Sequence, residues 1–209
     1  MLWRPSAAEE FWGWFREQAR QIAAMNTRTA ETRRLTADDE ALVARLADAL
    51  AEVDPRIFPY TGLAKDGIHE LILSTDGNAA AFPAVFALTR EAPILEGWRI
   101  VPLKQRANVA GRIGGGGVSL DCEKLRFFLD HEFDPPVLVL LADEDVETNF
   151  DAFQFLGSAV ALQVLGEHDF AASVSEIGVI SRREFERRWG HDGSPLEDLG
   201  KTFPPKPLH

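Results

Sequence analysis

The sequence predicts an α+β fold in which a mixed, mainly antiparallel sheet of about five strands carries helices mostly on one face. Two observations predict this class. Apolar residues recur at helical spacing in several segments, and short apolar runs bounded by glycine, proline and aspartate stand between them. With 209 residues and 45% apolar composition, the chain can also bury a full core without disulfides or metals.

The first helix is predicted over Phe11–Met25, with Ser6 as its N-cap. Its apolar residues share one face, except for Trp14, which lies about 200° around the helix from Trp12. Trp14 therefore needs a separate cover. A second packing layer, the short segment that contains Trp3, or another subunit could supply it.

A second helix is predicted to begin at Thr36, with Asp39 completing a capping box, and to end before Pro55. Between the two helices the polar stretch 26–35 is predicted to be a linker. The helical pair should pack across the sheet. We therefore expect three parts: an N-terminal helical arm and linker over 1–35, a single α+β domain over 36–200 and an extended, proline-rich tail over 201–209.

The segment Glu70–Val101 predicts a strand, a polar turn, an amphipathic helix and a second strand. The first of these strands should also pair with 57–64 in a hairpin around Lys65-Asp66-Gly67, where glycine can adopt a positive φ. The second strand, over 98–106, contains Pro102. Because proline lacks an N–H donor, this strand is expected at a sheet edge or with a bulge.

In the second half of the chain, the apolar run Val137–Leu141 is predicted to be the central strand, covered on both faces. A helix over 148–165 should follow, apolar nearly all round and ended by Gly166. A helix without a polar face is buried on two sides, so we expect the sheet on one side and the N-terminal helices or a dimer mate on the other. A last strand is predicted over 174–180.

The net charge of −11 is unevenly distributed. Residues 1–35 hold six Arg and four Glu, a net of +2, so the remainder carries −13. This acidity argues against a nucleic-acid partner and against binding to anionic lipid. The single cysteine, Cys122, fits a reducing compartment, and no apolar run approaches the roughly 18–20 residues of a membrane span. We therefore expect a cytoplasmic protein without a membrane segment.

One candidate ligand site lies between the strand end and the helix start of the 70–101 segment. Free N–H groups converge at such a junction and favour an anion. The same residue types also serve any helix start as turn and cap, which is the competing explanation. The candidate residues are Ser74, Thr75, Asp76, Gly77 and Asn78.

The second candidate is the glycine-dense loop 111–117, with Gly114 and Gly115 at its centre. Phosphate loops aim successive backbone N–H groups at an anion, with a lysine and a hydroxyl completing the site. This run lacks the Gly-Lys-Ser/Thr ending, so a hairpin or lid is the alternative. Weak binding of an anion at this loop stays an alternative, because Arg106 and Arg112 lie near it in the sequence.

No catalytic residue, metal site or cofactor is predicted from the sequence. The acidic stretch 143–147 fails the calcium-loop template, because its sixth and twelfth positions hold Thr148 and Gln154. The histidines form no His-Glu-x-x-His motif, and Gly-x-Ser-x-Gly is missing.

Several segments together resemble a family of uncharacterised bacterial proteins, a domain of unknown function. They read FWGWF at Phe11–Phe15, STDGNAAAFPAVFALTREAPILEGW at Ser74–Trp98 and LGEHDF at Leu165–Phe170. The resemblance implies a cytoplasmic bacterial protein. It implies no catalytic residues, since its fixed points are aromatic, glycine and proline residues suited to packing and turns.

The leading hypothesis for function is a non-catalytic binding or regulatory protein that acts through protein–protein contacts. Self-association would use the aromatic N-terminal helix or the apolar 148–165 helix, with Trp3, Trp14, Phe155 and Leu162 as interface residues. One alternative is a small, hydrolase-like enzyme that binds an anionic small molecule between Ser74–Asn78 and Gly111–Gly117. Another is an acidic inhibitor or immunity-type partner of a basic protein.

Overall fold

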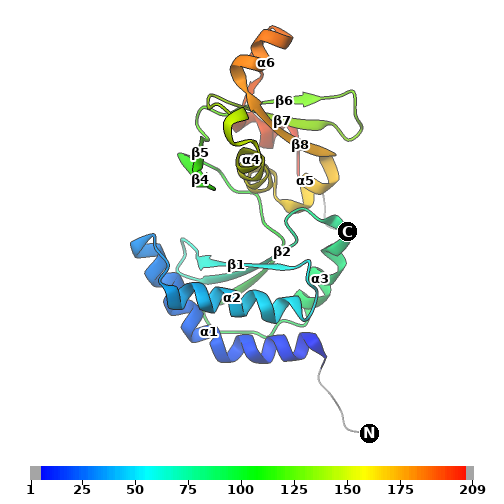
Figure 1. Ribbon diagram of the computed structural model, residues 1–209. Helices are drawn as coiled ribbons and strands as arrows, with labels where there is room; N and C mark the ends of the chain where they lie inside the picture. Colours follow the sequence, from blue (N-terminus) through cyan, green and yellow to red (C-terminus); the bar gives the residue numbers. More distant parts are fainter. Residues whose placement is uncertain (1–5, 206–209) are drawn as a thin grey trace. The chain divides into compact units, whose positions relative to one another are not determined.

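The computed structural model describes residues 6–205 and divides the chain into two compact units (Figure 1). Unit 1 ends at Lys104 and unit 2 begins at Gln105, and each is described by itself. The α+β class is confirmed. The single sheet of about five strands is not confirmed, because the strands form three small sheets of three, two and four strands. The boundary between the units falls after Lys104, whereas a boundary after residue 35 was predicted.

Two capped helices open unit 1. Helix α1 (Ala7–Thr32) begins at the predicted N-cap Ser6, and α2 (Ala37–Ala51) begins at Thr36, whose capping box with Asp39 is also as predicted. Both helices pack against the first strand, β1 (Phe58–Leu63).

The predicted linker 26–35 is wrong over most of its length, because α1 continues to Thr32. Tertiary contacts explain the longer helix. The buried Asn26 side chain donates to Thr61 Oγ1 (2.8 Å) and to the Gly62 carbonyl (3.1 Å), which fixes this turn of the helix against β1. The helix ends where Arg33 adopts a left-handed φ of 59°.

The sheet of unit 1 has the order β1-β2-β3. The antiparallel hairpin of β1 with β2 (His69–Ser74) and the helix between β2 and β3 (Trp98–Pro102) confirm the predicted strand–turn–helix–strand segment. That helix comprises a 3-10 turn, η1 (Ala79–Ala81), followed by α3 (Phe82–Arg90). Because β3 runs parallel to β2, the chain needs this helical crossover to return.

Both outer strands of this sheet carry a proline. Pro102 ends β3, which lies at the edge as predicted. In β1, Pro59 lies opposite Leu73, whose carbonyl accepts from Leu103 N (2.9 Å) on the β3 side. Leu73 therefore turns its backbone groups away from β1, and Pro59 turns its nitrogen away from β2. The missing N–H thus falls on the outer side of the sheet.

The core of unit 1 joins α1 to the sheet and to α3. Phe15 is fully buried and meets the Trp98 ring edge-on at 5.0 Å. Trp12 is 4% exposed, and its indole N–H donates to the Leu88 carbonyl (3.1 Å). Trp14 lies outside this cluster and is half-buried.

Unit 2 is built on a sheet of order β8-β7-β6-β9. The strand β7 (Val137–Ala142) is central, as predicted, with β6 (Arg126–Asp130) antiparallel on one side and β8 (Glu176–Ser181) parallel on the other. The short β9 (Ser194–Pro195) pairs with β6. Helix α4 (Phe150–Leu165), preceded by the 3-10 turn η2 (Glu147–Asn149), packs against β8.

The glycine-dense loop forms a second, two-stranded sheet that packs on α4 (Figure 1). Strands β4 (Arg112–Gly115) and β5 (Val118–Asp121) are joined by Gly116 and Gly117, whose φ values of 60° and 80° suit a tight two-residue hairpin turn. A Cβ on Gly116 would lie 3.1 Å from Ala152 Cβ. The glycines therefore make a turn and allow a close approach to α4.

The remaining helices are α5 (Glu167–Ser173), α6 (Arg182–Trp189), η3 (Leu196–Asp198) and α7 (Leu199–Thr202). The predicted extended tail is therefore helical at its start, and Phe203 packs against the unit 2 core. Residues 206–209 lie outside the described part of the chain. Within the described part, no helix is both long and apolar enough to cross a membrane.

Candidate functional site

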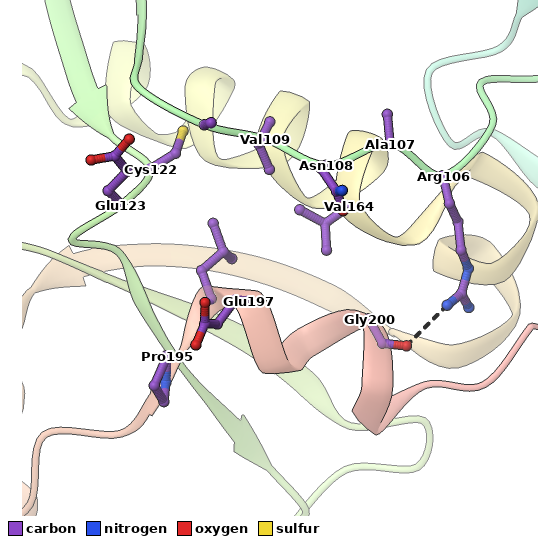
Figure 2. A pocket seen from close by; sticks show the side chains of 12 residues that line it. Arg106, Ala107, Asn108, Val109, Cys122, Glu123, Val164, Pro195, Glu197 and Gly200 are labelled. Atoms are coloured by element: carbon purple, nitrogen blue, oxygen red, sulfur yellow. Dashed lines mark hydrogen bonds between the residues drawn. The ribbon is translucent and has the colours of Figure 1, made fainter.

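Unit 2 contains a pocket of about 820 Å³ (Figure 2). One wall is the extended segment 106–110, and the opposite wall is formed by η3 and the start of α7. Val164 contributes from α4, and the end of β5 closes the pocket through Cys122 and Glu123. The lining residues thus come from four separate stretches of the chain.

Backbone hydrogen bonds hold these walls in place. Ala107 N donates to the Gln163 carbonyl (2.7 Å), which ties the extended segment to the last turn of α4. Cys122 N donates to the Gly111 carbonyl (2.8 Å). On the opposite wall, Leu196 N donates to the Leu125 carbonyl (3.1 Å). The pocket is therefore framed by ordered backbone.

Arg106 marks one end of the pocket. Its Nε and Nη2 lie 2.7 Å and 2.6 Å from Asp169 Oδ2, and its Nη1 donates to the Gly200 carbonyl (3.1 Å), the contact drawn in Figure 2. Asp169 itself is 7% exposed. The guanidinium charge is therefore matched by a buried carboxylate, and the side chain clamps the extended segment to α5 and α7.

Cys122 lies toward the other end, with its thiol turned toward the 106–110 segment (Figure 2). The residue is 4% exposed. Burial raises the pKa of the thiol, and the neighbouring carboxylates of Asp121, Glu123 and Glu144 raise it further. The thiol is therefore neutral at pH 7, and its polarisable sulfur atom lines the pocket.

Two carboxylates complete this end of the pocket. Glu123 follows Cys122 directly, and Glu197 projects from η3 (Figure 2). Both residues are exposed. Asn108, on the 106–110 segment, adds an amide that can donate and accept. The lining thus combines these polar groups with the apolar side chains of Val109, Val164 and Leu196.

The predicted ligand residues Ser74–Asn78 lie in unit 1, whereas the glycine loop belongs to unit 2. The pairing of these two segments in one site therefore stays a prediction. Asn78 caps the helix start, since its Oδ1 accepts from Ala80 N (3.2 Å). Ser74 and Thr75 are buried, and Thr75 Oγ1 donates to the Asn78 carbonyl (3.0 Å).

Asp76 is the centre of a polar cluster that the sequence did not indicate. Tyr60 OH donates to both carboxylate oxygens (2.9 and 3.1 Å), and Lys104 forms an ion pair with the same carboxylate. The Lys104 ammonium also lies 3.7 Å from the Tyr60 ring centroid. Asp76 has a left-handed φ of 51°, a conformation that aspartate tolerates better than most residues.

The pKa values in this cluster follow from its contacts. Burial lowers the pKa of Lys104, but the hydrogen bonds to Asp76 and Tyr60 outweigh burial, so the pKa is raised overall. Burial raises the pKa of Tyr60. The cluster therefore holds a charged lysine and a neutral phenol around one carboxylate.

Arg112 and the glycines Gly114 and Gly115 form part of the hairpin. Arg112 Nη2 donates to Ser119 Oγ (2.7 Å) and lies 3.3 Å from Glu144 Oε1. A Cβ on Gly115 would contact Leu156 Cδ2 at 3.4 Å. In the structure Arg112 thus meets carboxylates, Gly115 faces α4, and Gly114 faces Val118 and Ser119 of the paired strand.

The predicted interface residues differ in exposure. Phe155 is 70% exposed on α4, Trp14 is half-buried, and Leu162 is only 5% exposed. Trp3 lies outside the described residues. On the single chain α4 therefore has an open side, where Phe150 is also 55% exposed, and its cover by a dimer mate stays a prediction.

Comparison with family models, with curated proteins and with solved structures gave no match. The resemblance to a family of uncharacterised bacterial proteins thus stays a prediction. Between residues 6 and 205, no three side chains of His, Cys, Asp or Glu gather in a way that could hold a metal ion.

Sequence reasoning identified only Arg106 among the residues that line the pocket. It missed Asn108, Glu123, Val164 and Glu197, which lie far apart in the chain and belong to no motif. A sequence pattern marks residues that act within one local segment. This pocket depends on long-range packing, so no local pattern could have indicated it.

Proposed function

We propose that the protein is a non-catalytic binding protein that holds a small organic molecule in the unit 2 pocket. The observation that carries the proposal is the pocket itself, at about 820 Å³ within one compact unit. Ligand pockets span roughly 300–1,000 Å³ and combine apolar walls with a few polar groups. Here Val109, Val164 and Leu196 supply the apolar walls.

The chemistry of the lining favours binding over catalysis. The raised pKa of Cys122 keeps the thiol protonated, whereas a nucleophilic cysteine needs a lowered pKa. Arg106 holds Asp169, so its contacts serve the architecture of the pocket. These groups can contact a bound ligand without reacting with it.

A screen of small organic fragments by protein-observed NMR tests the proposal. Val164→Phe should place a ring in the apolar part of the pocket and weaken the shifts that a bound fragment causes at residues 106–110. The matched control is Gln163→Phe, which adds the same ring one residue earlier, at an exposed position that does not line the pocket. Fragments that bind Val164→Phe as well as they bind the unaltered protein would contradict the proposal.

A second candidate function is self-association through α4. Phe155 favours it, because an aromatic side chain that is 70% exposed on a helix is a typical contact residue. Leu162 is buried and takes no part in this version of the interface. Phe155→Asp should lower the mass measured by light scattering at high concentration. Phe133→Asp, at a residue 55% exposed in the same unit, is the control. A strict monomer before substitution would exclude this function.

A further inference from the structure

We infer that the outer edge of β4 binds the β4 strand of a second copy of this chain, so that two two-stranded sheets join into one sheet of four strands. The inference goes beyond the proposed function, because it names a contact surface apart from the pocket. It is also independent of the exposed α4 face, since it rests on backbone hydrogen-bonding groups of the β4–β5 hairpin.

The pairing within the hairpin determines which backbone groups of β4 are free. Cys122 N donates to the Gly111 carbonyl (2.8 Å), so Gly111 turns its carbonyl toward the β5 side. In an antiparallel ladder every second residue turns its N–H and C=O groups toward the partner strand. Arg112 and Gly114, both exposed, therefore turn theirs away from β5. Within residues 6–205 these outward groups have no hydrogen-bond partner.

The other outer strands are blocked in ways that proteins commonly use against edge-to-edge pairing. The prolines described above interrupt β1 and β3. In β8, the N–H and carbonyl of Val179 are bound by the Gln154 side chain (2.9 and 2.8 Å). The strand β9 is only two residues long and ends at Pro195, and in β5 the Asp121 carbonyl accepts from Lys124 N (3.0 Å). Among the strands that the structure describes, β4 alone has neither a proline nor a bound outward carbonyl.

The free groups of β4 are complementary to those of a second β4. In an antiparallel pair centred on Ile113, Arg112 of each copy lies opposite Gly114 of the other. Each of these two pairs exchanges two N–H···O=C bonds, so four bonds join the copies. The contact is the same on both copies, as the two-fold symmetry of a dimer requires.

The side chains of β4 permit this pairing. Gly114 adds no side chain, so each arginine faces a glycine across the new contact. The two arginines carry their own counter-charges, because Arg112 lies 3.3 Å from Glu144 Oε1 and 3.6 Å from Asp121 Oδ2 in the same chain. The pairing therefore brings together two neutralised guanidinium groups, and backbone bonds supply the attraction.

Solvent-exchange NMR of the full chain tests the pairing at single amides. The amides of Arg112 and Gly114 should exchange more slowly as the protein concentration rises, because pairing places them in hydrogen bonds. Where about four fifths of the chains are paired, their exchange should be about fivefold slower, since only the unpaired fraction exchanges. The Ser119 amide points outward on the opposite edge of the hairpin and should exchange at a constant rate.

The variant Gly114→Pro removes one donor from the edge, so it should abolish the slowing at Arg112 and any rise in mass by light scattering that the pairing causes. Its matched control, Gly114→Ala, keeps the donor and should pair normally. The added Cβ would lie 3.4 Å from the Val118 carbonyl oxygen, an ordinary contact. Arg112→Pro and Arg112→Ala repeat the comparison at the second donor, at the first residue of the strand, where proline is tolerated.

Exchange at Arg112 and Gly114 that does not change with concentration would overturn the inference. Pairing by Gly114→Pro as strong as that by Gly114→Ala would overturn it as well. If the mass rises with concentration and only Phe155→Asp lowers it, the α4 face is the interface and the β4 pairing is wrong. Fragment binding to the pocket is measured separately, so the proposed function stands or fails by its own test.

Discussion

Cys122 is a residue whose environment determines its reactivity. It is buried, and burial together with nearby carboxylates raises the pKa of its thiol. Because only the thiolate attacks disulfide reagents, we predict that Cys122 in the folded protein reacts with Ellman's reagent far more slowly than a free cysteine at pH 8. Urea should restore the ordinary rate. As the chain has one cysteine, the absorbance change reports this site alone. A rapid reaction of the folded protein would contradict this prediction.

Asp54 carries a prediction about pH. Hydrogen bonds from the Arg56 side chain and backbone lower the pKa of Asp54 from 3.8 to about 2. A lowered pKa in the folded state stabilises the protein above pH 3.8, and this contribution is lost as the pH falls toward 2. Arg56→Ala should return the pKa toward 3.8, measured by NMR titration of the carboxyl carbon.

The control for this titration is Arg45→Ala, which removes an exposed arginine from α2 and should leave the Asp54 titration unchanged. An Asp54 pKa near 3.8 before any substitution would show that the Arg56 contacts do not form in solution.

Helix α4 packs so closely on β8 that it requires a glycine. A Cβ at Gly157 would lie 2.2 Å from Val179 Cγ2, and Val179 is fully buried. Since a buried valine has little freedom to move, we predict that Gly157→Ala lowers the free energy of unfolding by about 1–3 kcal/mol.

Gly13→Ala is the matched control for that substitution. Gly13 also lies within a helix, but nothing stands within 4 Å of its Cβ position. The Gly13→Ala substitution should therefore raise the free energy of unfolding by about 0.5–1 kcal/mol, the usual difference between glycine and alanine within a helix. Urea denaturation of both variants measures the contrast, and a neutral Gly157→Ala would mean that α4 can move away from β8.

Local signals predicted the elements of this fold better than their assembly. The Thr36–Asp39 capping box marked the start of α2 correctly, and Pro102 marked an edge strand, because each feature acts on its own few residues. The linker prediction failed at Asn26, whose partners Thr61 and Gly62 lie far along the chain. The prediction of a single sheet was not confirmed for the same reason. Periodicity marks a strand but does not identify the strand with which it pairs.

The two units each bury their own core, which gives a prediction for the whole chain. Leu46 is 1% exposed in unit 1, and Leu140 is fully buried in unit 2. Truncation of a buried leucine to alanine costs about 2–5 kcal/mol. We predict that Leu46→Ala speeds hydrogen exchange mainly in unit 1 and that Leu140→Ala speeds it mainly in unit 2. Equal acceleration in both units by either variant would show that the chain unfolds as one cooperative body.

The prolines at the outer strands of the unit 1 sheet constrain how copies of this chain can associate. Growth of a sheet by an added strand needs an unbroken row of outward donors, and Pro59 interrupts that row on β1. Pro102 limits β3 in the same way at its end. Concentrated solutions of this protein should therefore resist fibril growth from this sheet. An assembly that leaves this sheet unextended can use side-chain contacts, for which the exposed phenylalanines of α4 are available.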